Sequence, residues 1–153
     1  MNNSDLSRHV RQPGEGEVIQ MHGPTAGSIT ILVDPKNMGH GIGLCTLIQT
    51  LDKGAAVPPH RHNHAEQVLY FLGGEGLVSL LGKDVSAKKG TLVYVPKGAV
   101  HAITNLGNGT LTFLETTSPP GFENAFREMS ASPDANPEQI AEIAARHDIL
   151  ISS

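Results

Sequence analysis

The sequence predicts an all-β domain, an antiparallel sandwich or barrel of the jelly-roll kind, followed by two short helices. Short apolar runs recur between residues 17 and 117 and are separated by turn chemistry, such as Asp-Pro-Lys-Asn at 34–37 and Gly-Gly-Glu-Gly at 73–76. The 153 residues include 17 glycines and 10 prolines, which is typical of many short strands joined by tight turns. Helical periodicity begins only after residue 118.

The expected strands follow one another along the first three quarters of the chain. They are short runs rich in β-branched, aromatic and other apolar residues. In chain order these runs cover 18–21, 28–33, 43–51, 67–72, 76–81, 91–95, 101–104 and 111–115. A jelly roll built from such strands closes over a central pocket. We expect residues 1–16 to form a flexible polar arm, 17–117 the barrel and 118–153 a helical extension.

The two helices are expected in that extension. The run 119–129 places its apolar residues on one helical face. The run 136–148 begins with Asn136 as N-cap, Pro137 in the first turn and Gln139 three residues after the cap, which is the pattern of a capping box. We expect both helices to pack on the outside of the barrel or against a partner subunit.

Charge and composition narrow the classes of partner. The formal net charge is -4, and no cluster of lysines and arginines is present, so neither nucleic acid nor an anionic membrane surface is an expected partner. A single cysteine cannot form an internal disulfide, and no apolar window is long enough to span a membrane. We therefore expect a cytoplasmic protein, and a homodimer because open-ended jelly rolls commonly bury exposed edges by pairing.

Three histidines and one glutamate have the types and spacing of a divalent metal site. His60 and His62 are two residues apart, so on an extended chain they point to the same face. Glu66 is four residues further on and keeps that parity, whereas His101 must come from another strand. Imidazole and carboxylate ligands leave iron, manganese, nickel, cobalt, copper and zinc open. Four such ligands leave two positions vacant on an ion that prefers six, which favours a reactive site.

The same residues carry a resemblance to a known family. One set has the spacing of the first cupin motif: Gly54, His60, His62, Glu66 and Gly73. Another has the spacing of the second: Gly90, Pro96, Gly98, His101 and Asn105. The resemblance implies a double-stranded β-helix, the cupin barrel, with the ion inside. The tail is also similar to small bacterial cupins grouped with quercetin 2,3-dioxygenase-like proteins, which implies that Glu66 is both a metal ligand and the catalytic base.

The resemblance and the composition together suggest a function. We expect a small-molecule substrate, because only six aromatic residues are present to line a larger pocket. Tyr70 continues the parity of Glu66 and is a candidate substrate-binding residue, with a plain core position as the alternative. His64 is a second candidate, at the pocket rim or exposed on the surface. The leading hypothesis is a metal-dependent dioxygenase acting on a small enolisable or hydroxylated molecule. The alternatives are a non-catalytic, sensor-type binding cupin and a non-redox metal-dependent isomerase or lyase.

Overall fold

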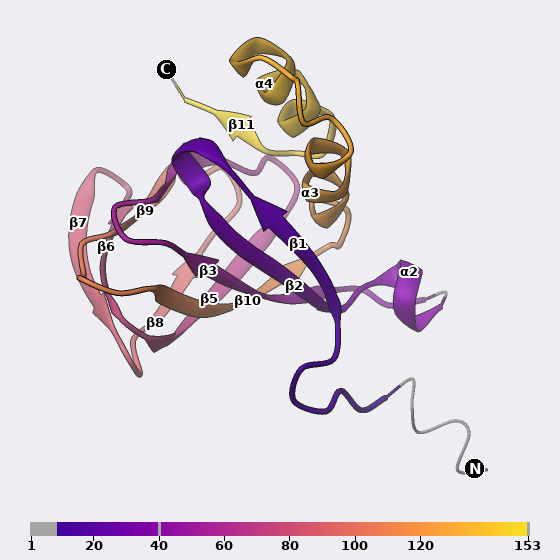
Figure 1. The fold of residues 1–153 in the computed structure, drawn as a ribbon, viewed down its shortest axis with the longest axis horizontal. Coiled ribbons are helices and arrows are strands. Elements are labelled where there is room, and N and C mark those ends of the chain that lie inside the picture. The colour runs from indigo at the N-terminus through magenta and orange to yellow at the C-terminus, as the bar shows by residue number, and fades with distance from the viewer. Residues whose placement is uncertain (1–8, 40, 153) are drawn as a thin grey trace.

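The computed structural model of the protein describes residues 9–39 and 41–152. Within them, two antiparallel sheets form a jelly-roll barrel, and two helices lie at one end of it (Figure 1). This confirms the all-β class and the two short helices near the C-terminus. Of the helices in the described residues, none is long and apolar enough to cross a membrane.

The larger sheet has six strands, and every neighbouring pair in it is antiparallel. Its strands alternate between a buried and a more exposed face, as a half-buried antiparallel sheet requires. In spatial order they are β1 (Glu17–Met21), β2 (Gly27–Val33), β3 (Cys45–Leu51), β10 (Leu111–Ser118), β5 (Glu66–Gly73) and β8 (Leu92–Val95).

The smaller sheet has five strands and carries two of the four predicted ligands, His60 and His101. Its central pair joins two segments that are about forty residues apart in the sequence, and it places His60 directly opposite His101. In spatial order the strands are β11 (Leu150–Ile151), β4 (Ala56–Arg61), β9 (His101–Asn105), β6 (Glu75–Leu80) and β7 (Lys83–Lys88).

The helices follow the signals in the sequence. α4 (Pro137–Arg146) begins with the predicted capping box, in which Asn136 and Gln139 satisfy each other's backbone N–H groups at 2.9 Å. α3 (Glu123–Ser130) precedes it and turns Phe122 and Ala125 inward. Two shorter helical turns lie among the first strands: η1 (Gly23–Thr25) and α2 (Pro35–Met38).

Three strands were not predicted by the pattern of apolar runs: β4, β7 and β11. β7 is almost entirely exposed and contains no continuous apolar run. It forms because it pairs with β6. The turn between them uses Leu81 and Gly82, both with positive φ, which is the hairpin geometry that continues the twist of the strands. β11 has only two residues and forms because the chain returns from α4 onto the edge of β4.

The core between the sheets has two parts. One fills the end of the barrel away from the helices, where the rings of Phe71 and Phe113 lie 5.3 Å apart. The other surrounds Ile29, Ile31 and Leu47 and includes Phe122 from the segment before α3. The C-terminal segment is therefore part of the hydrophobic core, and its helices are not accessory elements on the outer surface of a closed barrel.

Candidate metal centre

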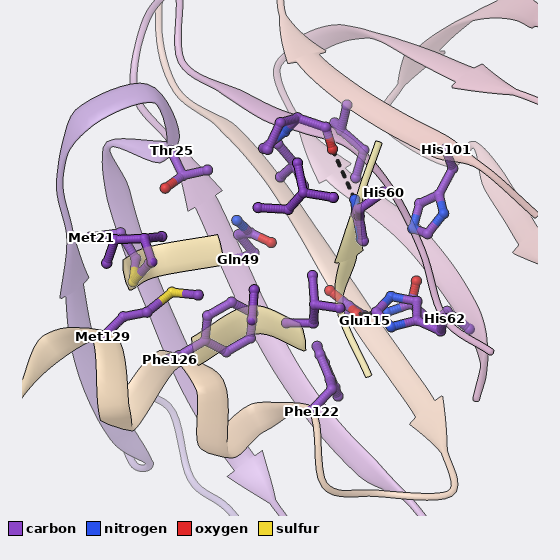
Figure 2. A pocket seen from close by; sticks show the side chains of 18 of the residues that line it. Met21, Thr25, Gln49, His60, His62, His101, Glu115, Phe122, Phe126 and Met129 are labelled. Carbon is purple, nitrogen blue, oxygen red and sulfur yellow. Dashed lines mark hydrogen bonds between the residues drawn. The ribbon is translucent and has the colours of Figure 1, made fainter. Parts of the chain in front are cut away.

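Three predicted ligands converge inside the barrel. His60 comes from β4 and His101 from the start of β9, whereas His62 follows directly after β4. Each of the three is buried and offers a ring nitrogen, and these nitrogens lie within 4.8 Å of one another. Figure 2 shows the three imidazoles grouped at one side of a pocket. The sequence spacing thus predicted a real spatial cluster.

The backbone sets the tautomer of all three rings. Each Nδ1 donates to a main-chain carbonyl, which leaves Nε2 without its proton and available as a ligand. Nε2 of His62 is buried and makes no hydrogen bond to any described residue. The Nδ1 contacts are His60 to Pro58 at 2.9 Å, His62 to Asp148 at 2.6 Å and His101 to Ala99 at 3.1 Å.

Burial also keeps these rings neutral. Loss of hydration, together with the adjacent His101, lowers the pKa of His60 to about 3. Burial likewise lowers the pKa of His101 to about 4, and it lowers the pKa of His62. Near neutral pH the cluster therefore presents three uncharged nitrogen donors. An oriented, neutral, partly unsatisfied donor set of this kind fits a divalent ion such as zinc, iron, nickel or copper.

The structure places Glu66 outside this cluster. Its side chain is exposed on the outer face of β5, where its Oε2 accepts a hydrogen bond from Tyr94 at 2.8 Å. The parity argument was wrong here because alternation holds only within one strand, and residues 62–65 form a turn between β4 and β5. The turn resets the alternation, so Gln67 is the buried residue at the pocket.

The two predicted substrate-binding residues also lie outside the pocket. Tyr70 shares the outward parity of Glu66 and is 41% exposed. His64 is exposed in the turn before β5. The pocket positions expected for both residues depended on the parity counted from His62 and fail for the same reason. For His64 the structure shows the alternative, an exposed surface position.

Gln67 and Glu115 are pocket residues that sequence reasoning missed. Glu115 lies on β10, beside β5, and is 5% exposed. Its Oε1 accepts hydrogen bonds from the amide of Gln67 and from Thr117, the latter at 3.2 Å. Burial raises the pKa of Glu115 to about 7. The available signal was the run Leu111–Glu115, where the acid shares the parity of Leu111 and Phe113 and so must point inward.

The rest of the pocket is mostly apolar, with Thr25 and Gln49 as its further polar residues, and it is closed by the C-terminal segment. The cavity volume is about 110 Å³. Phe122, Phe126 and Met129 point into it from α3 and the residue before it (Figure 2). The ring of Phe122 stands edge-on to His62, with the centroids 5.8 Å apart. Of the described residues that line the cavity, none is lysine or arginine. The site is a set of nitrogen donors and one carboxyl group in an apolar chamber.

Comparison with known proteins agrees with this architecture. Residues 47–117 match the model of the cupin domain family. An oxalate-binding protein of Thermotoga maritima is 39% identical over 64 residues, covering 42% of this chain and 53% of that protein. The chain thus spans about half the length of that relative. The polyketide synthase protein TcmJ of Streptomyces glaucescens is 27% identical over 111 residues, covering 72% and 74%.

A solved structure gives a likeness over a similar share of the chain. A predicted oxalate decarboxylase from Thermotoga maritima superposes with a TM-score of 0.60 and 29% identity, covering 72% of this chain and 98% of that one. The shared part leaves out more than a quarter of this chain. Fold and histidine cluster therefore point to the same family as the sequence motifs.

Proposed function

Because this chain is a small domain of the cupin superfamily, we propose that it is a metal-dependent enzyme acting on a small, mostly apolar, enolisable molecule. One observation carries the proposal: three neutral histidines and one buried carboxyl group share a pocket whose remaining lining is mostly apolar. The histidines would hold the ion through their Nε2 atoms. A bound ion supplies Lewis acidity to an oxygen of the substrate, and a redox-active ion also supplies electron-transfer chemistry.

The lining of the pocket favours a substrate with an apolar body over a dianion. No cationic side chain of the described residues lines the pocket, and Glu115 would repel a second negative charge. A dianion such as oxalate therefore lacks a partner beyond the ion itself, despite the likeness to an oxalate-binding protein. A ketone or phenol with an apolar body can place its oxygen near the histidines and its carbon skeleton against Phe126 and Met129. The likeness to a polyketide synthase protein agrees with such a substrate.

Glu115 replaces Glu66 as the candidate base. It is the carboxyl group that lines the cavity, and Gln67 and Thr117 hold its Oε1. Its Oε2 makes no hydrogen bond to a described residue, so it is free to accept a proton from a carbon or hydroxyl of the substrate. A pKa near neutrality suits a group that must take up and return a proton. In this proposal the histidines bind and Glu115 moves the proton.

Two outcomes of the same proton removal remain to be separated. Dioxygenation, the more specific of the two proposed reactions, consumes dioxygen together with the enol. A non-redox isomerase or lyase reaction needs none, and the apolar pocket with its single base serves both. A sensor-type protein would bind the same molecules without converting them.

The test uses the intact protein loaded separately with Fe²⁺, Ni²⁺ or Zn²⁺. Acetylacetone and a phenyl-substituted β-diketone serve as probes, and oxalate as the charged control. Enol absorbance and dissolved oxygen are followed in air and under nitrogen. Enol loss that stops under nitrogen supports dioxygenation, and enol loss under nitrogen supports the non-redox reaction.

A Glu115→Gln variant identifies the base. It should retain the metal and lose turnover by a factor of roughly 100 to 10,000, the usual contribution of a general base. Binding of the diketones without turnover by any metal form would leave only the sensor function. Metal binding without any interaction with the diketones would refute the proposed substrate class.

A further inference from the structure

We propose that Asp148, in the segment after α4, is a positioning residue of the metal centre. It holds both His62 and the turn that follows it, so the C-terminal segment becomes part of the metal site. The inference rests on the proposed metal binding. It adds that metal affinity depends on a residue that is not itself a metal ligand. Its basis is a set of hydrogen bonds between segments more than eighty residues apart in the sequence.

Asp148 contacts four consecutive residues of this turn. Its main-chain carbonyl accepts the Nδ1 proton of His62 at 2.6 Å. Its carboxylate accepts three backbone N–H groups: Asn63 at 2.9 Å, His64 at 2.9 Å and Ala65 at 3.2 Å. A carboxylate that binds three successive amides fixes the path of the turn, and the path of the turn fixes the orientation of the imidazole.

The local backbone explains why this residue can reach the turn. Asp148 has a φ of 61°, a left-handed conformation that aspartate and asparagine adopt more readily than most residues. The conformation ends α4 and directs the chain back toward the barrel. There Ile151 pairs with His60, and Ser152 donates its N–H to the carbonyl of Pro59 at 2.8 Å. One short segment thus contacts the backbone around two of the three histidines.

Metal affinity and docking of this segment must then be linked. A histidine already oriented by its Nδ1 partner loses less entropy when its Nε2 binds an ion, and loss of such partners typically weakens metal binding by about 10- to 100-fold. Linkage is reciprocal, so a bound ion must also stabilise the docked segment by the same factor. Because Ile149 belongs to this segment and lines the pocket, the ion also favours a closed pocket.

The experiment measures Co²⁺ affinity and the visible spectrum of bound Co²⁺ in the intact protein. Asp148→Asn keeps the left-handed backbone accessible but puts an NH2 group against the amides of the turn. Asp148→Gly keeps the backbone conformation and removes the side chain. Asp84→Asn is the matched control, because Asp84 also accepts a hydrogen bond, from Ser79, but lies on the exposed hairpin strand β7. Circular dichroism checks that each variant is folded.

We expect both Asp148 variants to raise the dissociation constant for Co²⁺ at least tenfold and to alter its spectrum, whereas Asp84→Asn leaves both unchanged. In the wild type, Co²⁺ should slow hydrogen exchange at the amides of 63–65 and of Ser152, a measurement that needs no variant. Unchanged affinity and spectrum in the Asp148 variants would overturn the inference, as would an equal loss in the control. A wild type that binds no Co²⁺ would instead refute the metal site itself.

Discussion

Stability of the metal-free protein should fall as the pH is lowered from 8 to 5, and Glu115 should oppose that fall. His60 and His101 have pKa values of about 3 and about 4 in the folded chain, against 6.5 when exposed. Between the folded and the unfolded pKa values the unfolded state binds more protons than the folded state, so lowering the pH favours unfolding. Each ring contributes about 2 kcal/mol over this range, at about 1.4 kcal/mol per pH unit below 6.5.

The contribution of Glu115 to the pH dependence of stability has the opposite sign to that of the histidines. Its pKa is raised from 4.5 to about 7, so between these values the folded state binds the extra proton and acid favours folding. It offsets about 2.5 kcal/mol of this loss over the same range, so the net loss of unfolding free energy from the three groups is about 1.5 kcal/mol. The lowered pKa of His62 adds to the loss in every variant equally. Differences between variants are therefore the quantity to measure.

The assay is urea unfolding followed by circular dichroism at pH 8 and pH 5 with a chelator present. Glu115→Gln removes the opposing group and should raise the loss of unfolding free energy to about 4 kcal/mol, whereas His101→Gln should cancel the loss. A difference of about 2 kcal/mol in the free energy of unfolding moves the midpoint of urea unfolding by about 1 M. Equal pH dependence in wild type and Glu115→Gln would refute the reasoning, because Glu115 would then titrate alike in both states.

Three further predictions concern packing and assembly. Phe122→Ala should lower the free energy of unfolding by about 3 kcal/mol and admit bulkier ligands, because it removes a buried ring that lines the pocket; unfolding curves and ligand titration check this. Gly27→Ala should strongly destabilise the fold, since an added Cβ would lie 1.9 Å from the carbonyl oxygen of Thr50. Gly109→Ala should be nearly neutral, because no atom lies within 4 Å of the added Cβ. Similar melting temperatures for the two variants would contradict this prediction. The homodimer expected from the sequence remains a prediction, and a monomer mass by light scattering would exclude it.

The sequence alone predicted the class of fold, the resemblance to cupins and the three histidines that cluster in the pocket. The fold class followed from local chemistry, because turn residues and apolar runs report the backbone around them. His60 and His62 could be paired because both lie within or directly after one extended segment. The capping box at Asn136 was equally local, and it formed as predicted.

Which side of a strand faces the pocket after a turn depends on how the sheets pack. Side-chain alternation carries no information across residues 62–65, so Glu66 pointed outward and Gln67 inward. Glu115 reached the site through the pairing of β10 with β5, and Asp148 through the return of the chain from α4. These are contacts between residues tens of positions apart in the sequence. They depend on how sheets and helices pack together, which spacing along the chain does not encode.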